Sequence, residues 1–275
     1  MTLEPRPHSA RPILIACSHG TSDAEGQLVI RGIVDELRML RPGLDVREAF
    51  VDVQTPALPD VVAALPEGAE AIIVPLLLST GFHVRVDIAS ATALRPGVRA
   101  AKPLGPDPRL AAILKDRLDA VDAVASVVVA SAGSTDPAAA VAVEAVVAML
   151  RVFRPGEITV GFSAGAHPRV PVALQAARDS ESAEGAAPSR VTIASYLLAP
   201  GFFFDRLAEA GADELSAPLA PDPRIAAIAL DRFDAAVSAV ACEQRCEACV
   251  LCPVAPDEHP VTPTANNPIF RAPAP

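Results

Sequence analysis

Two histidines and one aspartate each follow a different apolar segment of the chain. His19 follows the apolar run 13–17 after one serine, Asp52 lies in AFVDVQTPAL, and His83 lies in PLLLSTGFHVRVDI. Two imidazoles and a carboxylate form a mixed N/O donor set, which suits Fe(II), Co(II), Ni(II) or Zn(II) better than Mg or Ca. We therefore predict that these three side chains bind a transition metal if the fold brings them together.

Four cysteines are crowded into a short segment near the C-terminal end. Cys242, Cys246, Cys249 and Cys252 have the spacing C-x3-C-x2-C-x2-C. Iron–sulfur clusters use tight cysteine runs of this kind, whereas structural zinc usually pairs two short knuckles across a longer separation. We predict an iron–sulfur cluster, [4Fe–4S] or [2Fe–2S], with zinc or a free or redox-active thiol set as alternatives. Cys17 is interpreted instead as a small buried apolar residue.

The elements that must position these residues occur twice along the chain. The segment PLGPDPRLAAILKDRLD at 103–119 matches PLAPDPRIAAIALDRFD at 218–234 without gaps. In each half, a short apolar run predicts a buried parallel strand, two further strands follow with helical segments between them, and a short fourth strand precedes the PDPR helix. The three longer strands are predicted at 13–17, 45–51 and 71–77 in the first half, and at 127–130, 158–162 and 191–198 in the second.

This alternation predicts an α/β fold of two tandem units, each a four-stranded parallel sheet flanked by helices. The first unit is predicted at 10–124 and the second at 125–240, followed at 241–275 by the cysteine cluster and a Pro-rich tail. Asp107 and Asp222 each precede a proline and are expected to cap helices. Ligands of such sheets bind outside the carboxyl ends of the strands, where the three metal-ligand candidates would meet.

The duplication serves as an internal control on the metal site. If the three polar residues served only the fold, both halves should keep something polar at the same positions. All three are replaced by apolar residues in the second half, so the pattern favours one metal site in the first half. The aligned pairs are His19 with Ala132, Asp52 with Ala164, and His83 with Phe203.

Composition narrows the classes of protein that the chain can be. The net charge is −10 and no Lys/Arg cluster is present, which argues against nucleic acid as a partner. No uncharged apolar run is long enough to span a membrane, and the N-terminus lacks the apolar region of a signal peptide, so we expect a cytoplasmic protein. A mobile loop is predicted at 181–189 and a largely disordered tail at 253–275.

The segments HGTSD, AFVDVQTPALPDVV and IIVPLLLSTGFHVRVDI resemble the sirohydrochlorin chelatases, the class II group that serves sirohaem and cobalamin synthesis. The resemblance covers roughly 13–236 as two fused family units, strongly in the first and weakly in the second. It implies that His19 and His83 carry the metal and the chemistry, and that Asp52 is the acidic residue of the family motif. It also supports an iron–sulfur centre at the C-terminal cysteines.

The resemblance implies insertion of a divalent metal into sirohydrochlorin. A neutral imidazole can ligate a metal or accept a pyrrole proton near pH 7, so His19 and His83 suit both steps, with Asp52 as third ligand or orienting carboxylate. No G-x-x-x-x-G-K-[ST] motif is present, so ATP-driven insertion is not indicated. Arg85 and other arginines are candidates for binding the substrate carboxylates.

Insertion of Fe(II), giving sirohaem, is the leading hypothesis. Insertion of Co(II) for cobalamin and a non-catalytic metal or tetrapyrrole carrier are the alternatives. Because its two units are fused, the chain is expected to be a monomer.

Overall fold

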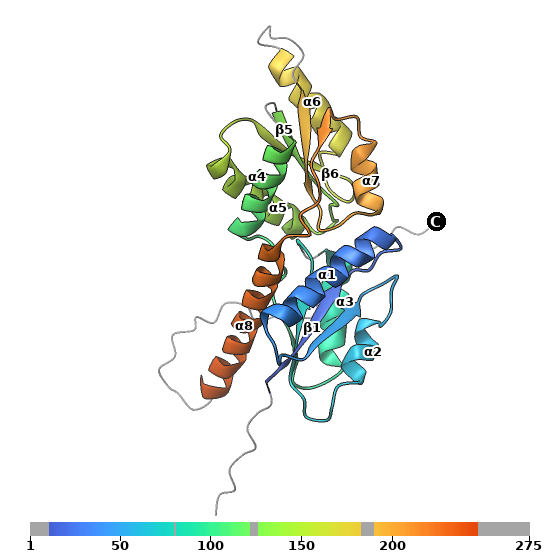
Figure 1. The fold of residues 1–275 in the computed structure, drawn as a ribbon, viewed down its shortest axis with the longest axis vertical. Coiled ribbons are helices and arrows are strands. Elements are labelled where there is room, and N and C mark those ends of the chain that lie inside the picture. Colours follow the sequence, from blue (N-terminus) through green and yellow to red (C-terminus); the bar gives the residue numbers. More distant parts are fainter. Residues whose placement is uncertain (1–10, 80, 122–125, 183–189, 247–275) are drawn as a thin grey trace, which may run out of the picture. The chain divides into compact units, whose positions relative to one another are not determined.

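The computed structural model describes residues 11–79, 81–121, 126–182 and 190–246, with the backbone alone described at 82–84, 181–182 and 241–246 (Figure 1). The chain divides into a unit Met1–Ala239, which holds both sheets, and a unit Val240–Pro275. Two four-stranded parallel sheets are present, so the predicted fold class is confirmed. The predicted tail at 253–275 lies outside the described residues.

The first half alternates strands and helices and forms a sheet with the order β2-β1-β3-β4. All its strand pairs are parallel, and β1 is central, with Cys17 opposite Ala49 of β2 and Pro75 of β3. The elements are β1 (Ile13–Ser18), α1 (Ala24–Leu40), β2 (Val46–Phe50), α2 (Leu58–Ala63), β3 (Ala71–Pro75), α3 (Phe82–Ala93), β4 (Val98–Ala100) and α4 (Pro108–Ala120).

The second half repeats this order as β6-β5-β7-β8, again with all pairs parallel. The longer strands end within two residues of their predicted ends. Helix α6 continues to Ser182, so the first two residues of the segment predicted as a loop at 181–189 are helical, and 183–189 lie outside the described residues. The elements are β5 (Ser126–Ser131), α5 (Pro137–Phe153), β6 (Ile158–Phe162), α6 (Val170–Ser182), β7 (Val191–Tyr196), α7 (Phe202–Ala208), β8 (Glu214–Leu215) and α8 (Pro223–Cys246).

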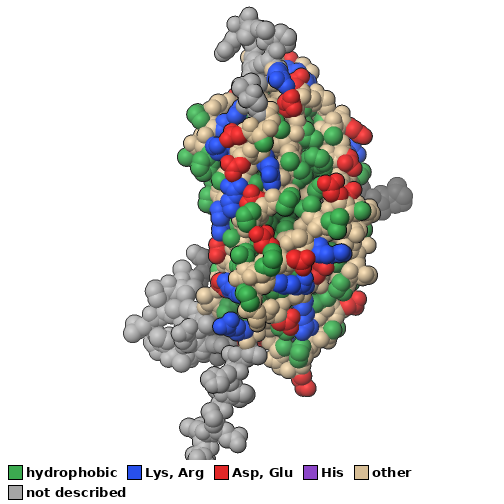
Figure 2. Space-filling view, in the orientation of Figure 1, with side chains coloured by type: hydrophobic (Ala, Val, Ile, Leu, Met, Phe, Trp, Pro, Cys, Tyr) green, Lys and Arg blue, Asp and Glu red, His purple; other side chains and the backbone are tan. Residues whose placement is uncertain are grey.

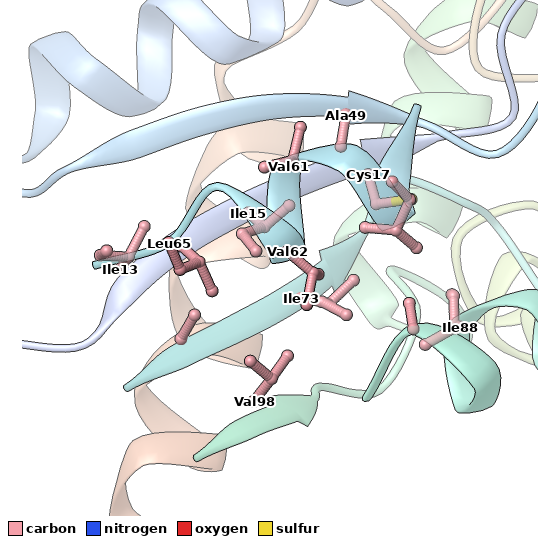
Figure 3. Close-up of a cluster of buried hydrophobic side chains, with 13 residues drawn as sticks. Ile13, Ile15, Cys17, Ala49, Val61, Val62, Leu65, Ile73, Ile88 and Val98 are labelled. Carbon is pink, nitrogen blue, oxygen red and sulfur yellow. The ribbon is translucent and has the colours of Figure 1, made fainter. Parts of the chain in front are cut away.

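The core of the first half shows how an aliphatic sequence fills this fold. Side chains alternate across a strand, so Ile13, Ile15 and Cys17 of β1 point to the same face of the sheet. They pack against buried residues of α2 and α3, among them Val62 and Ile88 (Figure 3). Burial of both faces of the inner strands β1 and β3 explains why these two strands read as continuous apolar runs, whereas the edge strand β2 keeps Arg47 and Glu48.

The helices after the PDPR motifs begin as the sequence predicts. The Asp107 side chain accepts a hydrogen bond from the Arg109 backbone N–H at 3.0 Å, and Asp222 accepts the same bond from Arg224 at 3.0 Å. Proline occupies the first helical position after each cap, where its missing N–H costs nothing. The predicted N-caps are confirmed.

Helix α4 belongs to the first half in sequence but packs against α5 and β7 of the second. From α4, Arg117 donates to the backbone oxygens of Pro218, Leu219 and Pro221 at 3.0, 3.0 and 2.8 Å. From α8, Arg232 donates in the same way to the segment that precedes α4. The two halves are therefore tied together by reciprocal contacts from their last helices, which the strand and helix pattern alone does not predict.

Candidate metal centre

The segments that carry His19 and Asp52 meet just beyond the carboxyl ends of β1 and β2. The Asp52 backbone N–H donates to the His19 carbonyl oxygen at 2.8 Å, which extends the pairing of the two strands past their ends. Both residues are exposed, so their polar side chains are open to a ligand from solvent. One Asp52 carboxylate oxygen accepts the Val53 N–H at 2.7 Å, which leaves the other oxygen without a described partner. The strand order thus brings these two predicted ligands together.

The backbone directly after each of these two residues is tightly constrained. Gly20 has φ +97°, and a Cβ at this position would lie 2.0 Å from the Asp52 carbonyl oxygen. Only glycine permits both the left-handed conformation and this close approach. Val53 also lies in the left-handed region, at φ 63°. This conformation costs a β-branched residue roughly 1–2 kcal/mol, so the loop that carries Asp52 is strained where it turns.

His83 is the second residue of α3, which begins after Gly81 at the end of the β3 segment. The order β2-β1-β3 places the β3 segment beside β1 on the side opposite β2. The backbone of His83 therefore follows the strand next to His19, as the sequence predicts. Its side chain lies outside the described residues. Among the side chains that are described, no group of three or more His, Cys, Asp or Glu could hold a metal, so the three-residue ligand set remains a prediction.

The second half reproduces the backbone of this site without its polar groups. Ala164 donates its N–H to the Ala132 carbonyl oxygen at 2.8 Å, the same bond that joins Asp52 to His19. Gly133 has φ +83°, and a Cβ there would lie 1.9 Å from the Ala164 oxygen, as at Gly20. Gly165, with φ +69°, takes the place of the strained valine. The scaffold is common to both halves, whereas the polar residues and the strain belong to the first.

Of the five cysteines, only Cys17 has a described side chain. Cys17 is fully buried in the first-half core, as expected for an apolar role. Burial, together with the charge of Asp87, raises the pKa of the Cys17 thiol to about 12, so it stays protonated near neutral pH. Cys242 and Cys246 belong to the C-terminal end of α8, but their side chains are not described, and Cys249 and Cys252 lie outside the described residues. The iron–sulfur cluster stays a prediction.

Two supporting contacts were not identified from the sequence. Gln54 accepts the Thr21 backbone N–H at 2.9 Å, which joins the loops after β1 and β2 a second time. Arg85 of α3 lies 3.6 Å from Asp136, the N-cap of α5 in the second half. The glutamine side chain in AFVDVQTPAL was the available signal for the first contact. The second joins distant parts of the chain and has no local signal.

Charge on the molecule is mixed rather than concentrated. Figure 2 shows Lys and Arg side chains interspersed with Asp and Glu over the face in view, with apolar side chains between them. No described helix combines the length and the apolarity that a membrane crossing requires.

Comparison with known proteins identifies the family. The model of the CbiX family matches the chain twice, at residues 13–121 and 126–236. The chain belongs to the CbiX family. The family resemblance and the two-unit organisation expected from the duplicated motifs are therefore confirmed.

Two sirohydrochlorin cobaltochelatases are among the relatives. The protein from Sulfurisphaera tokodaii is 33% identical over 108 residues, which are 38% of this chain and 88% of the relative. The protein from Methanothermobacter thermautotrophicus is 29% identical over 128 residues, with 38% of this chain and 89% of the relative covered. Each relative thus aligns with a part of this CbiX member that corresponds in length to about one family unit.

Solved structures of two-unit length share the fold. SirB from Bacillus subtilis, determined with Fe3+, has a TM-score of 0.65 and 18% identity, and covers 82% of this chain and 95% of its own. The terminal enzyme for siroheme biosynthesis in denitrifying bacteria, CbiX, has a TM-score of 0.61 and 22% identity, and covers 82% of this chain and 99% of its own. At these identities the likeness shows the fold of this CbiX member alone.

Proposed function

We propose that this chain is a chelatase that inserts a divalent metal into sirohydrochlorin without ATP. The observation that carries the proposal is the asymmetry within a shared scaffold. Both halves keep the same hydrogen bond between the loops after their first two strands, but only the first half places His19 and Asp52 on it. The names of the cobaltochelatase relatives and of the siroheme-forming CbiX enzyme support sirohydrochlorin as the substrate.

In this proposal His19 and His83 hold the incoming metal, and Asp52 is the third ligand or orients one of the imidazoles. Insertion requires that the metal lose its waters and that two pyrrole N–H protons leave the macrocycle. The exposure of His19 and Asp52 suits both demands, because the metal can arrive from solvent and protons can return to it. The neutral imidazole is the form of histidine that binds metal and accepts protons.

We propose Fe(II) as the preferred metal, with Co(II) as the alternative, since imidazole and carboxylate ligands accept both. The test is an anaerobic assay in which the full chain and sirohydrochlorin are supplied with Fe(II) or Co(II), and the loss of the free-base absorption spectrum is followed. A higher kcat/KM with Fe(II) supports the preference, and a higher value with Co(II) assigns the chain to cobalt insertion. A change limited to one equivalent per protein with either metal would favour a carrier.

We also propose that Cys242, Cys246, Cys249 and Cys252 bind an iron–sulfur cluster. The support is their spacing in the sequence, because these side chains lie outside the described residues. Anaerobically purified protein should be brown and absorb in the charge-transfer region. Colourless protein that contains one equivalent of zinc would contradict the cluster and favour a zinc site.

A further inference from the structure

Two glutamine side chains hold the backbone of Thr21, two residues after the predicted metal ligand His19. Gln54 accepts the Thr21 backbone N–H at 2.9 Å with its amide oxygen, and Gln27 donates its amide N–H to the Thr21 carbonyl oxygen at 2.8 Å. Gln54 belongs to the loop after β2, and Gln27 lies near the start of α1. Both glutamines are half-buried. The peptide groups on both sides of Thr21 are therefore fixed, each by a different element.

These contacts follow a flexible link in the chain after His19. On the other side of His19, β1 and the hydrogen bond from the Asp52 N–H to the His19 carbonyl oxygen fix the backbone. Gly20 comes next, at φ +97°, and a glycine gives the backbone more freedom to rotate than any other residue. A metal ligand must keep its position to within about 0.5 Å to bind well. Fixing Thr21 therefore restrains the loop that carries His19 from the far side of this glycine.

The second half keeps the turn after its first strand but lacks the Gln27 side chain. The Thr21 hydroxyl accepts the backbone N–H of the helix cap Asp23 at 3.1 Å, and Ser134 makes the same bond to its own helix cap at 3.0 Å. Counted from the two helix caps, Ala140 is the counterpart of Gln27. An alanine side chain has no donor, so the turn forms without the contact that Gln27 supplies.

Gln54 is replaced in the same way. Its backbone N–H donates to the Asp52 carbonyl oxygen at 2.6 Å. The second half has the equivalent bond from Ala166 to Ala164 at 2.7 Å, so Ala166 is the counterpart of Gln54. Both glutamines thus occur in the half that carries the predicted metal ligands and are alanines in the other half. A role in folding the shared turn would not require this difference.

The two halves also join their loops by different means. In the second half the loops touch directly, because a Cβ at Gly165 would lie 2.3 Å from the Ser134 carbonyl carbon. Val53 occupies the position of Gly165 with nearly the same φ, 63° against 69°, and it has a Cβ. The first-half loops therefore cannot approach each other as closely. The side chain of Gln54 bridges the wider gap, so a side-chain hydrogen bond replaces a direct backbone contact.

We propose that Gln27 and Gln54 are positioning residues for metal binding, which set the position of His19 through the backbone of Thr21. This rests on the proposed function, in which His19 is a ligand of the incoming metal. Neither glutamine is a ligand, so its removal weakens metal binding without taking a donor atom from the site. The two hydrogen bonds run in opposite directions: Gln27 must donate, and Gln54 must accept.

The test is a titration of the metal-free full chain with Co(II) alone, followed by the absorption of bound cobalt. The part of the signal that is absent from His19→Ala/His83→Ala reports the predicted metal site. Gln27→Ala/Gln54→Ala should raise the Kd of that site about tenfold, since losing the partners that orient metal ligands commonly costs about 10–100-fold in affinity. Gln175→Ala removes a glutamine side-chain hydrogen bond from α6 and should leave the Kd unchanged.

Two glutamate substitutions separate positioning from a loss of packing. Gln54→Glu keeps an oxygen that accepts the Thr21 N–H and should bind Co(II) at least as tightly as wild-type protein. Gln27→Glu loses the donor and sets a carboxylate against the Thr21 carbonyl oxygen, so its Kd should rise about tenfold. Both variants add the same charge and keep nearly the same side-chain volume. A difference between them therefore comes from the direction of the hydrogen bond.

Equal Kd values for Gln27→Glu and Gln54→Glu, or a wild-type Kd in Gln27→Ala/Gln54→Ala, would overturn the proposal. Far-UV circular dichroism confirms that each variant is folded before it is titrated. Failure of the proposed function is distinguishable, because it would appear as a wild-type chain that binds Co(II) through His19 but does not turn over sirohydrochlorin. A wild-type chain without a signal that depends on His19 would overturn the metal site and the positioning role together.

Discussion

Replacement of Arg232 by methionine should remove the contact through which α8 holds the segment before α4. The guanidinium donates to the carbonyl oxygens of Pro103, Leu104 and Pro106 at 2.9, 2.9 and 3.1 Å, and lies 3.3 Å from a carboxylate oxygen of Asp107. Hydrogen bonds to a charged group contribute about 1.5–3 kcal/mol each when buried. The side chain is 23% exposed and methionine keeps its apolar stem, so the expected loss is about 3 kcal/mol in total.

Urea unfolding followed by far-UV circular dichroism measures this loss. Circular dichroism is chosen over intrinsic fluorescence because the chain has no Trp and a single Tyr. Arg117→Met removes the mirrored contact from α4 and should cost a similar amount. Arg190→Met is the control, because it removes an exposed ion pair to Glu214 and should cost less than about 1 kcal/mol. If Arg232→Met and Arg117→Met cost no more than Arg190→Met, the reciprocal contacts do not hold the two halves together.

Four further substitutions test individual positions. Gly20→Ala and Gly133→Ala should each lower the free energy of unfolding in urea by at least about 2 kcal/mol, because each glycine has a positive φ and no room for a Cβ. Only Gly20→Ala should also lower turnover, and equal turnover in both variants would contradict the placement of the site. Val53→Gly should stabilise the chain by about 0.5–1 kcal/mol, because it relieves the left-handed valine at the entropic cost of a glycine, and an unchanged unfolding midpoint would refute the strain. Burial acts to raise the pKa of Asp107, but the hydrogen bonds and charge of its arginine partners lower this pKa below 3.8, and the pKa of Asp222 is lowered in the same way. The stability that the two carboxylates contribute is therefore present at neutral pH and is lost as the pH falls below about 4. Asp107→Asn should flatten the loss of unfolding free energy between about pH 4 and pH 2, and an unaltered slope would contradict this assignment.

The sequence predicted the fold well because its local signals agree with one another. Continuous apolar runs indicate parallel strands buried on both faces, and the Asp-Pro pairs at Asp107 and Asp222 mark helix starts that the structure confirms. The exchange of contacts by α4 and α8 could not be predicted, because Arg117 and Arg232 bond to carbonyl oxygens more than a hundred residues away. Every residue has a backbone carbonyl, so a hydrogen bond to the backbone does not depend on the type of the accepting residue.

The candidate site was predictable in part, because local signals place its residues at the ends of neighbouring strands. His19 and Asp52 follow neighbouring strands, so sheet topology alone brings them together, and the structure places their backbones in a direct hydrogen bond. The strain at Val53 and the contact of Arg85 with Asp136 depend on loop geometry and on packing between distant segments. Neither is encoded in local spacing, and both became visible only in three dimensions.

The central claim is that the first half alone inserts the metal, through His19 and His83. The most direct test compares anaerobic turnover of sirohydrochlorin with Fe(II) and with Co(II) by wild-type protein, His19→Ala/His83→Ala and His167→Ala, at equal folded concentration. His167 is an exposed histidine in the second half and serves as the matched control. The account predicts loss of at least about a hundredfold in kcat/KM for His19→Ala/His83→Ala, as removal of acid–base groups commonly causes, and wild-type turnover for His167→Ala. Wild-type turnover by His19→Ala/His83→Ala with both metals would contradict it.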